Sequence, residues 1–540
     1  MNLQKPLGVL PWIVMFLGAM AFVPGCKEQP EKTYEPTFES LDSHPVPQWF
    51  RDARFGIFIH WGVYSVPAFH EWFVEMMSPR STWGQTPGGP PYTAAQGDLP
   101  DSVFQAETRG SRGQANQYQR ENYGVDFEYD QFIPMFKAEQ FDPDAWADLF
   151  VQAGARYVVM TARHGDEFAL WPTRFANRNS MDMGPHRDLA GDLLKAVRSR
   201  GLKMGFYHNT TYSFWDNRFP GKEWVEYMNN SIKELVDLYQ PDILWGDVTV
   251  SPFPDSGGKP LNADHFNSKE VIAYFYNHSK NPDEVVTNER WGHDTTRAGS
   301  QSKRSVSKSL LSQYEKELNI VNGSLLGDFQ TPERRNISRI YTMPWETCDA
   351  LDPTSWGYNR RTPDEMYMTT NELVDYLADI ASKGGNLLIN IGPKADGTIP
   401  EVMQDRLRGI GAWLSVNGEA IYGTRPWSVY GEGYTNEEAG SWDSPDGGYQ
   451  FKAGDIRFTR KGNVLYAILL EWPGREILIS SVKGLKFKKL SLLGSDEKIH
   501  WQQTGEGLRV SLPPDPVSPH ANTLKLKCDD KALDSDIVRR

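Results

Sequence analysis

The sequence contains few cysteines and no excess of positive charge, and both features exclude whole classes of protein. Three cysteines among 540 residues are too few for a disulfide framework or a cysteine-rich zinc module. Lysine and arginine number 57 against 70 aspartate and glutamate residues, which gives a formal net charge of -13. Because binding to nucleic-acid phosphates requires a basic surface, no nucleic-acid partner is expected.

Several catalytic signatures are also missing. The chain has no G-x-G-x-x-G after a predicted strand and no G-x-x-x-x-G-K-[ST] phosphate loop. It has no G-x-S-x-G nucleophile elbow, and its 11 histidines form no H-x-x-x-H pair on a predicted helix. Nucleotide-binding, serine-hydrolase and zinc chemistry are therefore not indicated, and we expect no metal or cofactor.

The N-terminal segment is predicted to export and tether the chain. Lys5 precedes an apolar run over residues 7–23, and Cys26 follows directly after a glycine. A basic start, a short apolar centre and a small residue before the cut describe a secretory signal, and the run is short for a spanning helix. We predict a lipoprotein-type signal peptide over residues 1–25, lipidated at Cys26, and a tether over residues 26–44. An ordinary signal or a membrane anchor is the alternative.

This prediction places the mature protein outside the cytoplasm. The expected location is the periplasm or cell envelope, and the lipid on Cys26 is the only membrane contact expected.

Short apolar runs alternate with amphipathic segments over residues 45–425. Continuous apolar runs are typical of strands buried on both faces, and residues 188–200 and 224–239 show helical spacing of their apolar side chains. Several runs end in reactive residues, among them His60, His164 and Asp247. Because the carboxyl ends of strands build the active site of a barrel, we predict an α/β fold with a (β/α)8-like barrel catalytic domain here.

Two further regions depart from this alternation. Polar stretches over residues 79–120 and 292–322 are predicted to be long surface loops. Over residues 426–540 the helical period disappears, and short apolar runs are separated by turns. This pattern predicts a C-terminal all-β sandwich domain.

Carboxylates in aromatic surroundings are the best candidates for chemistry. Asp247 follows the apolar run Ile-Leu-Trp-Gly, and Glu289, Glu333 and Glu346 lie beside tryptophan, arginine or phenylalanine. A carboxylate at the end of a buried strand is costly without a partner or a function, although a helix cap or a structural ion pair would also explain it. Two carboxylates on a barrel rim with tryptophan and histidine suggest glycoside hydrolysis.

A series of motifs over about residues 45–425 sharpens this interpretation. In chain order the motifs are residues 55–68 (FGIFIHWGVYSVPA), 71–73 (EWF), 141–146 (FDPDAW), 153–157 (AGARY), 239–247 (YQPDILWGD), 288–291 (NERW), 328–333 (DFQTPE), 384–393 (GGNLLINIGP) and 396–400 (DGTIP). Together they resemble the α-L-fucosidases of glycoside hydrolase family 29. The resemblance implies a retaining hydrolase that releases α-linked L-fucose from oligosaccharides or polysaccharides through a covalent intermediate.

The resemblance also implies roles for single residues. Asp247 matches the family's nucleophile and Glu333 the acid/base of many members, with Glu289 and Glu346 as alternative acids because the family varies at this position. The positions that match the family's sugar contacts are His60, Glu71, Trp72, His164, Tyr207, Trp245 and Arg290.

One motif departs from the family. Residues 163–168 read RHGDEF where the family usually has K-H-H-D-G-F, so Gly165 replaces a sugar-binding histidine and Glu167 replaces a glycine. This change leaves two alternatives open. The enzyme would act on another L-fucose-like sugar such as L-galactose, or the chain would be a glycan-binding lipoprotein without activity.

Overall fold

A computed structural model describes residues 33–74, 112–124, 126–209, 222–247, 264, 266–291, 326–334, 337–341, 343–435 and 451–529. The signal peptide and the lipidation site Cys26, predicted from sequence, lie outside these ranges, as do residues 79–111 and 292–322 of the predicted loops. Residues 34–540 form one compact unit. Among the described residues, no helix combines the length and apolar character needed to cross a membrane.

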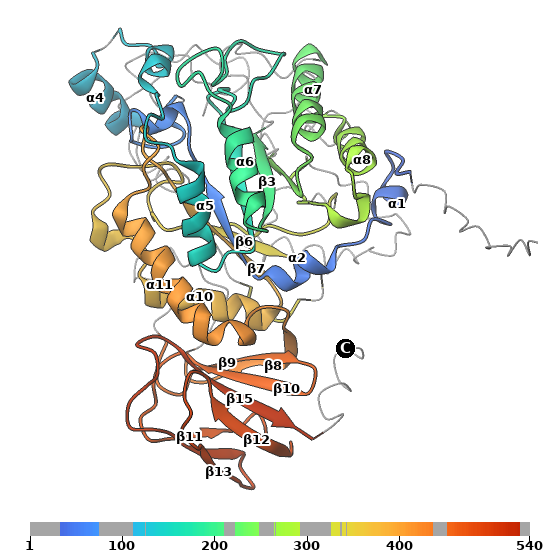
Figure 1. Ribbon diagram of the computed structural model, residues 1–540, viewed down its shortest axis with the longest axis vertical. Helices are drawn as coiled ribbons and strands as arrows, with labels where there is room; N and C mark the ends of the chain where they lie inside the picture. The colour runs from blue at the N-terminus through green and yellow to red at the C-terminus, as the bar shows by residue number, and fades with distance from the viewer. Residues whose placement is uncertain are drawn as a thin grey trace, which may run out of the picture. The chain divides into compact units, whose positions relative to one another are not determined.

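A parallel sheet forms the centre of the first domain (Figure 1). Its seven strands are β1 (Phe55–Ile59), β2 (Tyr157–Arg163), β3 (Lys203–Asn209), β4 (Ile243–Asp247), β5 (Val286–Thr287), β6 (Glu346–Ala350) and β7 (Asn386–Ile391). They are ordered β5-β4-β3-β2-β1-β7-β6. The sequence pattern of buried apolar runs is confirmed, since β1, β2 and β7 are buried along their whole length.

An irregular segment completes the ring between the two edge strands. Single parallel bridges join Asn288, just after β5, to Phe329, and join Gln330 and Glu333 to Trp345 and Cys348 at β6. Residues 329–333 therefore occupy the eighth position of the barrel. The predicted barrel is confirmed.

Helices surround the sheet, as Figure 1 shows for α5 to α8, α10 and α11. The helices are α1 (Phe38–Leu41), α2 (Gln48–Ala53), α4 (Arg112–Asn122), α5 (Pro143–Gln152), α6 (Leu189–Ser199), α7 (Lys222–Tyr239), α8 (Ser268–His278), α10 (Thr370–Lys383) and α11 (Glu401–Asn417). Local sequence sets their ends. Asp188 caps α6 by accepting a hydrogen bond from the Gly191 N–H at 2.8 Å, and Gly201 follows with a positive φ of 76°.

Two segments are more ordered than the sequence predicted. Helix α4 occupies part of the stretch predicted to be a loop over residues 79–120, which is a correction; its Tyr118 ring lies 5.2 Å from that of Phe69. In the segment predicted as a tether, Tyr34 and Leu41 are buried against α8. Apolar contacts spaced over a short stretch give no clear periodic signal in the sequence.

The C-terminal strands form two antiparallel sheets. The strands are β8 (Arg425–Glu432), β9 (Ile456–Lys461), β10 (Val464–Leu469), β11 (Glu476–Ile479), β12 (Phe487–Leu492), β13 (His500–Gln503), β14 (Leu508–Ser511) and β15 (Asn522–Cys528). One sheet has the order β12-β15-β10-β9-β8 and the other β11-β14-β13. Apolar residues of both sheets share one core, so the predicted sandwich is confirmed.

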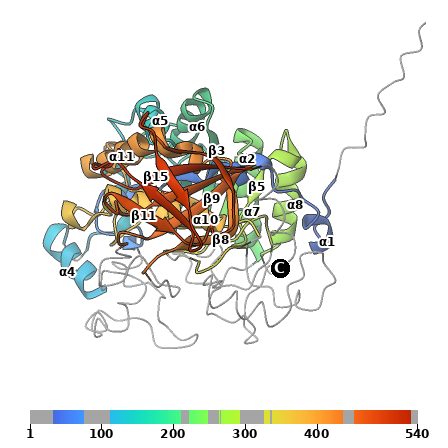
Figure 2. The ribbon, with the colours of Figure 1, turned by 90° about the horizontal axis from the view of Figure 1, so that it is seen from below.

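The barrel and the sandwich are joined by buried polar contacts near α10 and α11, which lie behind the C-terminal strands in Figure 2. Asp379 of α10 binds Lys383 at 2.7 Å and also the guanidinium of Arg457 from β9. Trp413 of α11 donates its indole N–H to the carbonyl of Ala521 at 2.7 Å.

Candidate active site

Asp247 is the last residue of β4, at the carboxyl end of the barrel. Its side chain is 13% exposed. Gly246 precedes it, and a Cβ there would lie 2.6 Å from the Trp291 ring, so only glycine allows this close packing beside the carboxylate. Burial raises the pKa of Asp247, with Arg290 opposing the rise and Glu333 adding to it.

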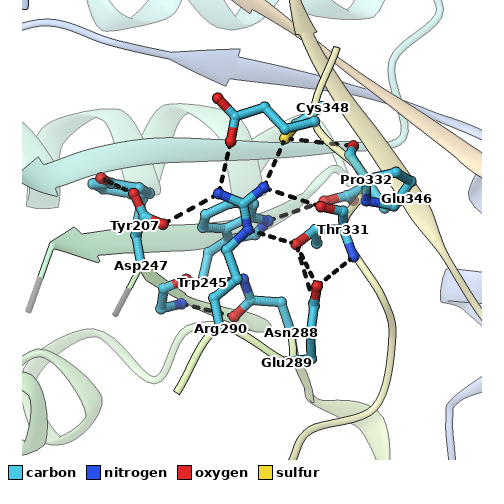
Figure 3. Close-up of polar contacts among 12 residues, drawn as sticks. Tyr207, Trp245, Asp247, Asn288, Glu289, Arg290, Thr331, Pro332, Glu346 and Cys348 are labelled. Carbon is cyan, nitrogen blue, oxygen red and sulfur yellow. Dashed lines mark hydrogen bonds and ion pairs between the residues drawn. The ribbon is translucent and has the colours of Figure 1, made fainter. Parts of the chain in front are cut away.

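Arg290 joins the two carboxylates that the sequence singled out. One terminal nitrogen of its guanidinium lies 3.2 Å from Asp247 Oδ1 and 2.8 Å from Glu333 Oε2. Figure 3 shows the guanidinium at the centre of these contacts, with Asp247 on one side. Because both oxygens contact the same nitrogen, they are separated by no more than the sum of these distances.

That limit is informative for a glycosidase. Retaining enzymes hold their two carboxyl groups about 5–5.5 Å apart, and inverting enzymes hold them about 6.5–9.5 Å apart to make room for a water. The contacts of Arg290 keep the facing oxygens of Asp247 and Glu333 closer together than the carboxyl groups of inverting enzymes.

The carboxylate of Glu289 is hydrogen-bonded to Thr331. Its Oε1 accepts hydrogen bonds from the backbone N–H and the hydroxyl of Thr331 at 2.9 and 3.0 Å. The hydroxyl and carbonyl oxygens of Thr331 in turn accept from Arg290 at 2.9 and 3.0 Å (Figure 3). Burial raises the pKa of Glu289, and Arg290 opposes the rise. Glu289 thus orients Thr331 and, through it, the guanidinium.

Glu346 lies in the barrel interior, with no exposed surface. Its oxygens accept hydrogen bonds from the Trp245 indole at 3.0 Å and from the Tyr157 hydroxyl. Burial raises the pKa of Glu346 to about 7, although both hydrogen bonds lower it. By contrast, the Glu333 side chain is 37% exposed, so of the three candidate acids it is the one open to an incoming group.

The stacked rings of Tyr207 and Trp245 lie beside Asp247. The Tyr207 hydroxyl donates to Asp247 Oδ2 at 2.7 Å. The two rings are stacked with centroids 5.5 Å apart, and the guanidinium of Arg290 lies 4.9 Å from the centroid of Trp245. Neighbouring register positions on β3 and β4 bring these side chains together.

Two predicted sugar contacts are buried neutral histidines. Burial lowers the pKa of His60 to about 4 and that of His164 to about 3. His60 Nδ1–H donates to Asn390 Oδ1 at 2.7 Å, and the Asn390 amide is oriented by its own donation to the Trp356 carbonyl at 2.6 Å. This network leaves Nε2 of His60 as an acceptor for a hydroxyl group.

Glu71 and Trp72 complete this side of the site. Trp72 contacts the His164 ring at 4.4 Å, and His164 stacks on Tyr207 at 5.8 Å. Glu71 Oε2 accepts hydrogen bonds from the Ser355 hydroxyl at 2.8 Å and from the N–H of Trp356 at 3.0 Å. Burial raises the pKa of Glu71, but His70, His164 and His60 outweigh it and lower the value to about 2. All the residues predicted for the site are therefore neighbours, although their roles stay predictions.

The structure shows where the carboxylate added by the departing motif lies. Glu167 adopts a positive φ of 58°, a conformation that suits the glycine usual there. Its carboxylate lies 3.3 Å from the guanidinium of Arg163. That guanidinium lies over the Tyr227 ring of α7 at 5.2 Å, so the added charge is paired between the sheet and α7 rather than among the sugar-contact residues.

Three residues near the site were not assigned a role from sequence. Asn390 orients His60, Thr331 orients Arg290, and the Trp356 ring lies 5.2 Å from His60. Asn390 and Thr331 lie within motifs quoted for the family resemblance, which is the only signal that could have indicated them.

A metal centre is not indicated in the part of the chain that the structure describes. No group of three or more histidine, cysteine, aspartate and glutamate side chains there is placed to hold an ion.

Comparison with known proteins identifies the family. The profile described as "Alpha-L-fucosidase" matches residues 21–419, and "Alpha-L-fucosidase C-terminal domain" matches residues 450–527. The chain is 34% identical to the tissue alpha-L-fucosidase of Homo sapiens over 528 residues, covering 95% of both chains. It is 34% identical to that of Rattus norvegicus over 493 residues, covering 89% of this chain and 88% of the relative.

A solved structure agrees with these sequence matches. Thermotoga maritima alpha-fucosidase, in complex with a mechanism-based inhibitor, is 34% identical with a TM-score of 0.66, covering 92% of this chain and 100% of that one. The resemblance inferred from the motifs is thereby confirmed, and the chain belongs to the α-L-fucosidase family, glycoside hydrolase family 29, a family of glycosidases that hydrolyse fucosides.

Proposed function

We propose that the chain is an exported retaining α-L-fucosidase that releases L-fucose from fucose-containing oligosaccharides or polysaccharides. The observation that carries this proposal is the position of Arg290 between Asp247 and Glu333. It supports double displacement, because it holds the two carboxyl groups close to each other. Membership of the α-L-fucosidase family supports fucose as the sugar.

In the first step, Asp247 attacks the anomeric carbon. A bond forms between its carboxylate oxygen and that carbon while the bond to the leaving oxygen breaks. Glu333, protonated, gives its proton to the leaving oxygen. The half-exposed position of Glu333 supports this role, because the leaving group must reach the acid from outside the barrel.

In the second step, Glu333 acts as a base. It takes a proton from water, the water oxygen bonds to the anomeric carbon, and the bond to Asp247 breaks. The sugar leaves with its original anomeric configuration, and Glu333 is protonated again. Tyr207 and Arg290 support both steps by stabilising the Asp247 carboxylate when it is free.

Hydrolysis of 4-nitrophenyl α-L-fucoside tests this proposal. We expect release of nitrophenol by the wild type and loss of turnover in Asp247→Ala. Proton NMR of the first-formed sugar should show the α-anomer. Azide should restore turnover to Glu333→Ala but not to Glu289→Ala; the reverse result would move the acid/base to Glu289, and β-anomer formation would overturn retention.

A second substrate remains a candidate because Gly165 replaces a histidine that contacts sugar in the family. An L-fucose-like sugar with a larger C5 substituent, such as L-galactose, would fit a site with one contact fewer. Turnover of aryl α-L-galactosides above that of aryl α-L-fucosides would favour it. Retention on a fucose-bearing column without any turnover would instead favour a binding protein.

The proposal for export and lipid anchoring at Cys26 rests on the order of basic, apolar and small residues before it. Metabolic labelling with a fatty acid should mark the wild type and not Cys26→Ser. Equal labelling of both would show that Cys26 is not the anchor.

A further inference from the structure

A cavity of about 230 Å³ lies at the amino-terminal end of the barrel, between the barrel and the C-terminal sheet. Helix α2, the residues before β6 and the start of β7 contribute one side, and strands β8 and β9 contribute the other. Asp247, by contrast, ends β4 at the carboxyl end of the barrel. The cavity is therefore separate from the catalytic site.

Positive charge is concentrated around this cavity. Its lining includes four arginines, which are Arg51, Arg54, Arg425 and Arg460, and no aspartate or glutamate among the described lining residues. Asp52 binds Arg425 at 2.8 Å from outside the lining. Such a concentration is notable in a chain whose formal net charge is -13.

Two of these guanidinium groups are held close together. Arg54 and Arg425 each donate to the same oxygen, the carbonyl of Thr424, at 2.6 Å. Burial, together with the nearby charge of Arg425, lowers the pKa of Arg54 to about 9. Two cations that converge on one carbonyl repel each other; Asp52 offsets part of this repulsion from outside the cavity, and an anion bound inside it would offset more.

Two buried N–H donors on the lining are also unused. The Nε of Arg54 and the indole nitrogen of Trp345 have no hydrogen-bond partner among the described residues. Arg54 is 2% exposed and Trp345 is 1% exposed. Buried donors are nearly always paired, so the wall of the cavity at these two residues is short of acceptors.

We propose that this cavity is a binding site for a tetrahedral oxyanion, the sulfate ester of a glycan or a free phosphate or sulfate ion. Guanidinium groups match the oxygens of such anions with paired hydrogen bonds. Arg51 of α2 and Arg460 of β9 both line the cavity and supply the charge, while the unpaired donors of Arg54 and Trp345 leave its wall short of acceptors. On an enzyme that cleaves glycans, such a site would retain a sulfated chain while its other end is processed.

Thermal unfolding of the full chain tests the site. The probes are sodium sulfate and sodium phosphate, with sodium chloride at equal ionic strength as the reference, and dextran sulfate against neutral dextran. The variant is Arg51→Gln/Arg460→Gln, and each single change is measured beside it in case the double variant folds poorly. The matched control is Arg408→Gln/Arg509→Gln, which removes two exposed charges that bind Glu401 and Glu476 elsewhere.

We expect sulfate or phosphate to stabilise the wild type and the control beyond the chloride reference. The double variant should bind these anions at least about tenfold more weakly. Its turnover of 4-nitrophenyl α-L-fucoside should match that of the wild type, because the changed residues lie away from Asp247. This activity also shows that the variant is folded, and the anion titration does not depend on the proposed reaction.

The two sources of the oxyanion are distinguished by the polymer probes. Binding of dextran sulfate more tightly than inorganic sulfate, with no binding of dextran, assigns the site to a sulfated glycan. Binding no tighter than that of the inorganic anions assigns it to a free ion. Equal stabilisation of the double variant and the wild type, or no stabilisation beyond chloride, would overturn the proposal.

Discussion

Tyr207 and Asp247 are linked directly by a 2.7 Å hydrogen bond, although 40 residues separate them in the chain. Adjacent strands β3 and β4 bring them together, and Tyr207 is fully enclosed. Burial and the Asp247 carboxylate raise the pKa of Tyr207 well above its usual range, so its hydroxyl remains a donor. The hydrogen bond lowers the pKa of Asp247 and favours its ionised form.

Tyr207→Phe should therefore impair catalysis in a pH-dependent way. Loss of a hydrogen bond to a charged group is worth about 1.5–3 kcal/mol, so kcat/KM should fall about 10–150-fold. A nucleophile must be ionised, and its activity is lost as pH falls through its pKa. Because the variant raises the pKa of Asp247, the acid limb of the kcat/KM profile should move to higher pH. An unchanged acid limb would show that Asp247 does not set it.

Glu346→Gln should change how stability depends on pH. The pKa of Glu346 is about 7 in the folded chain against 4.5 ordinarily, so the folded state binds a proton more tightly than the unfolded state. The contribution of protonated Glu346 to the free energy of unfolding is fully present below pH 4.5. It is lost as pH rises through 7, and the difference is about 3 kcal/mol. Urea unfolding at both ends of this pH range should show that the free energy of unfolding of the variant does not fall with rising pH in this way. Glu476→Gln, at an exposed carboxylate, is the control.

Glu167→Gln should lower stability while leaving fucosidase turnover nearly unchanged. The substitution leaves the buried guanidinium of Arg163 without its carboxylate partner, at a cost of about 1–3 kcal/mol because the pair is not fully enclosed. Equilibrium unfolding and aryl-fucoside turnover measure the two effects. A large change in KM for the fucoside would show instead that Glu167 acts on the sugar.

Asp379→Asn should lower the stability of the interface between the barrel and the sandwich. Asp379 has no exposed surface and binds Lys383 and Arg457, so its neutralisation leaves two buried cations, at a cost of about 3–5 kcal/mol. Calorimetry should show a lower Tm. Glu419→Gln removes a carboxylate that binds Lys525 at 2.8 Å at the surface of the same interface, and it should cost about 0–1 kcal/mol. Equal losses would contradict the buried network.

The parts of the fold with strong sequence patterns were predictable. Apolar runs located β1 to β5 and β7, because strands buried on both faces consist almost entirely of apolar residues. Strand β6 was missed, because its sequence Glu-Thr-Cys-Asp-Ala is polar even though every residue in it is buried. Strand β13 is exposed along its length and carries no alternation.

Most of the candidate site could be indicated from sequence only through its motifs. Asp247 could be found because it ends an apolar run, but its relation to Glu333 depends on a contact with Arg290, 43 residues away from each. Thr331 and Asn390 have no distinctive chemistry as single residues, and their importance arises from which side chains they orient. Contacts that orient another side chain can be recognised only in the three-dimensional structure.

Hydrogen bonding between strands is not uniform around the barrel, and the two residues of the proposed catalytic pair differ in this respect. Strand β4 is paired with β3 along its whole length, including Asp247, and with β5 at Ile243 and Leu244. Glu333 stands on residues 329–333, which only isolated bridges join to the adjacent strands. Insertions or deletions between the isolated bridges can move Glu333 without breaking a ladder, whereas Asp247 cannot move without the sheet. A fold of this kind fixes the position of one member of the proposed pair and leaves that of the other free to evolve.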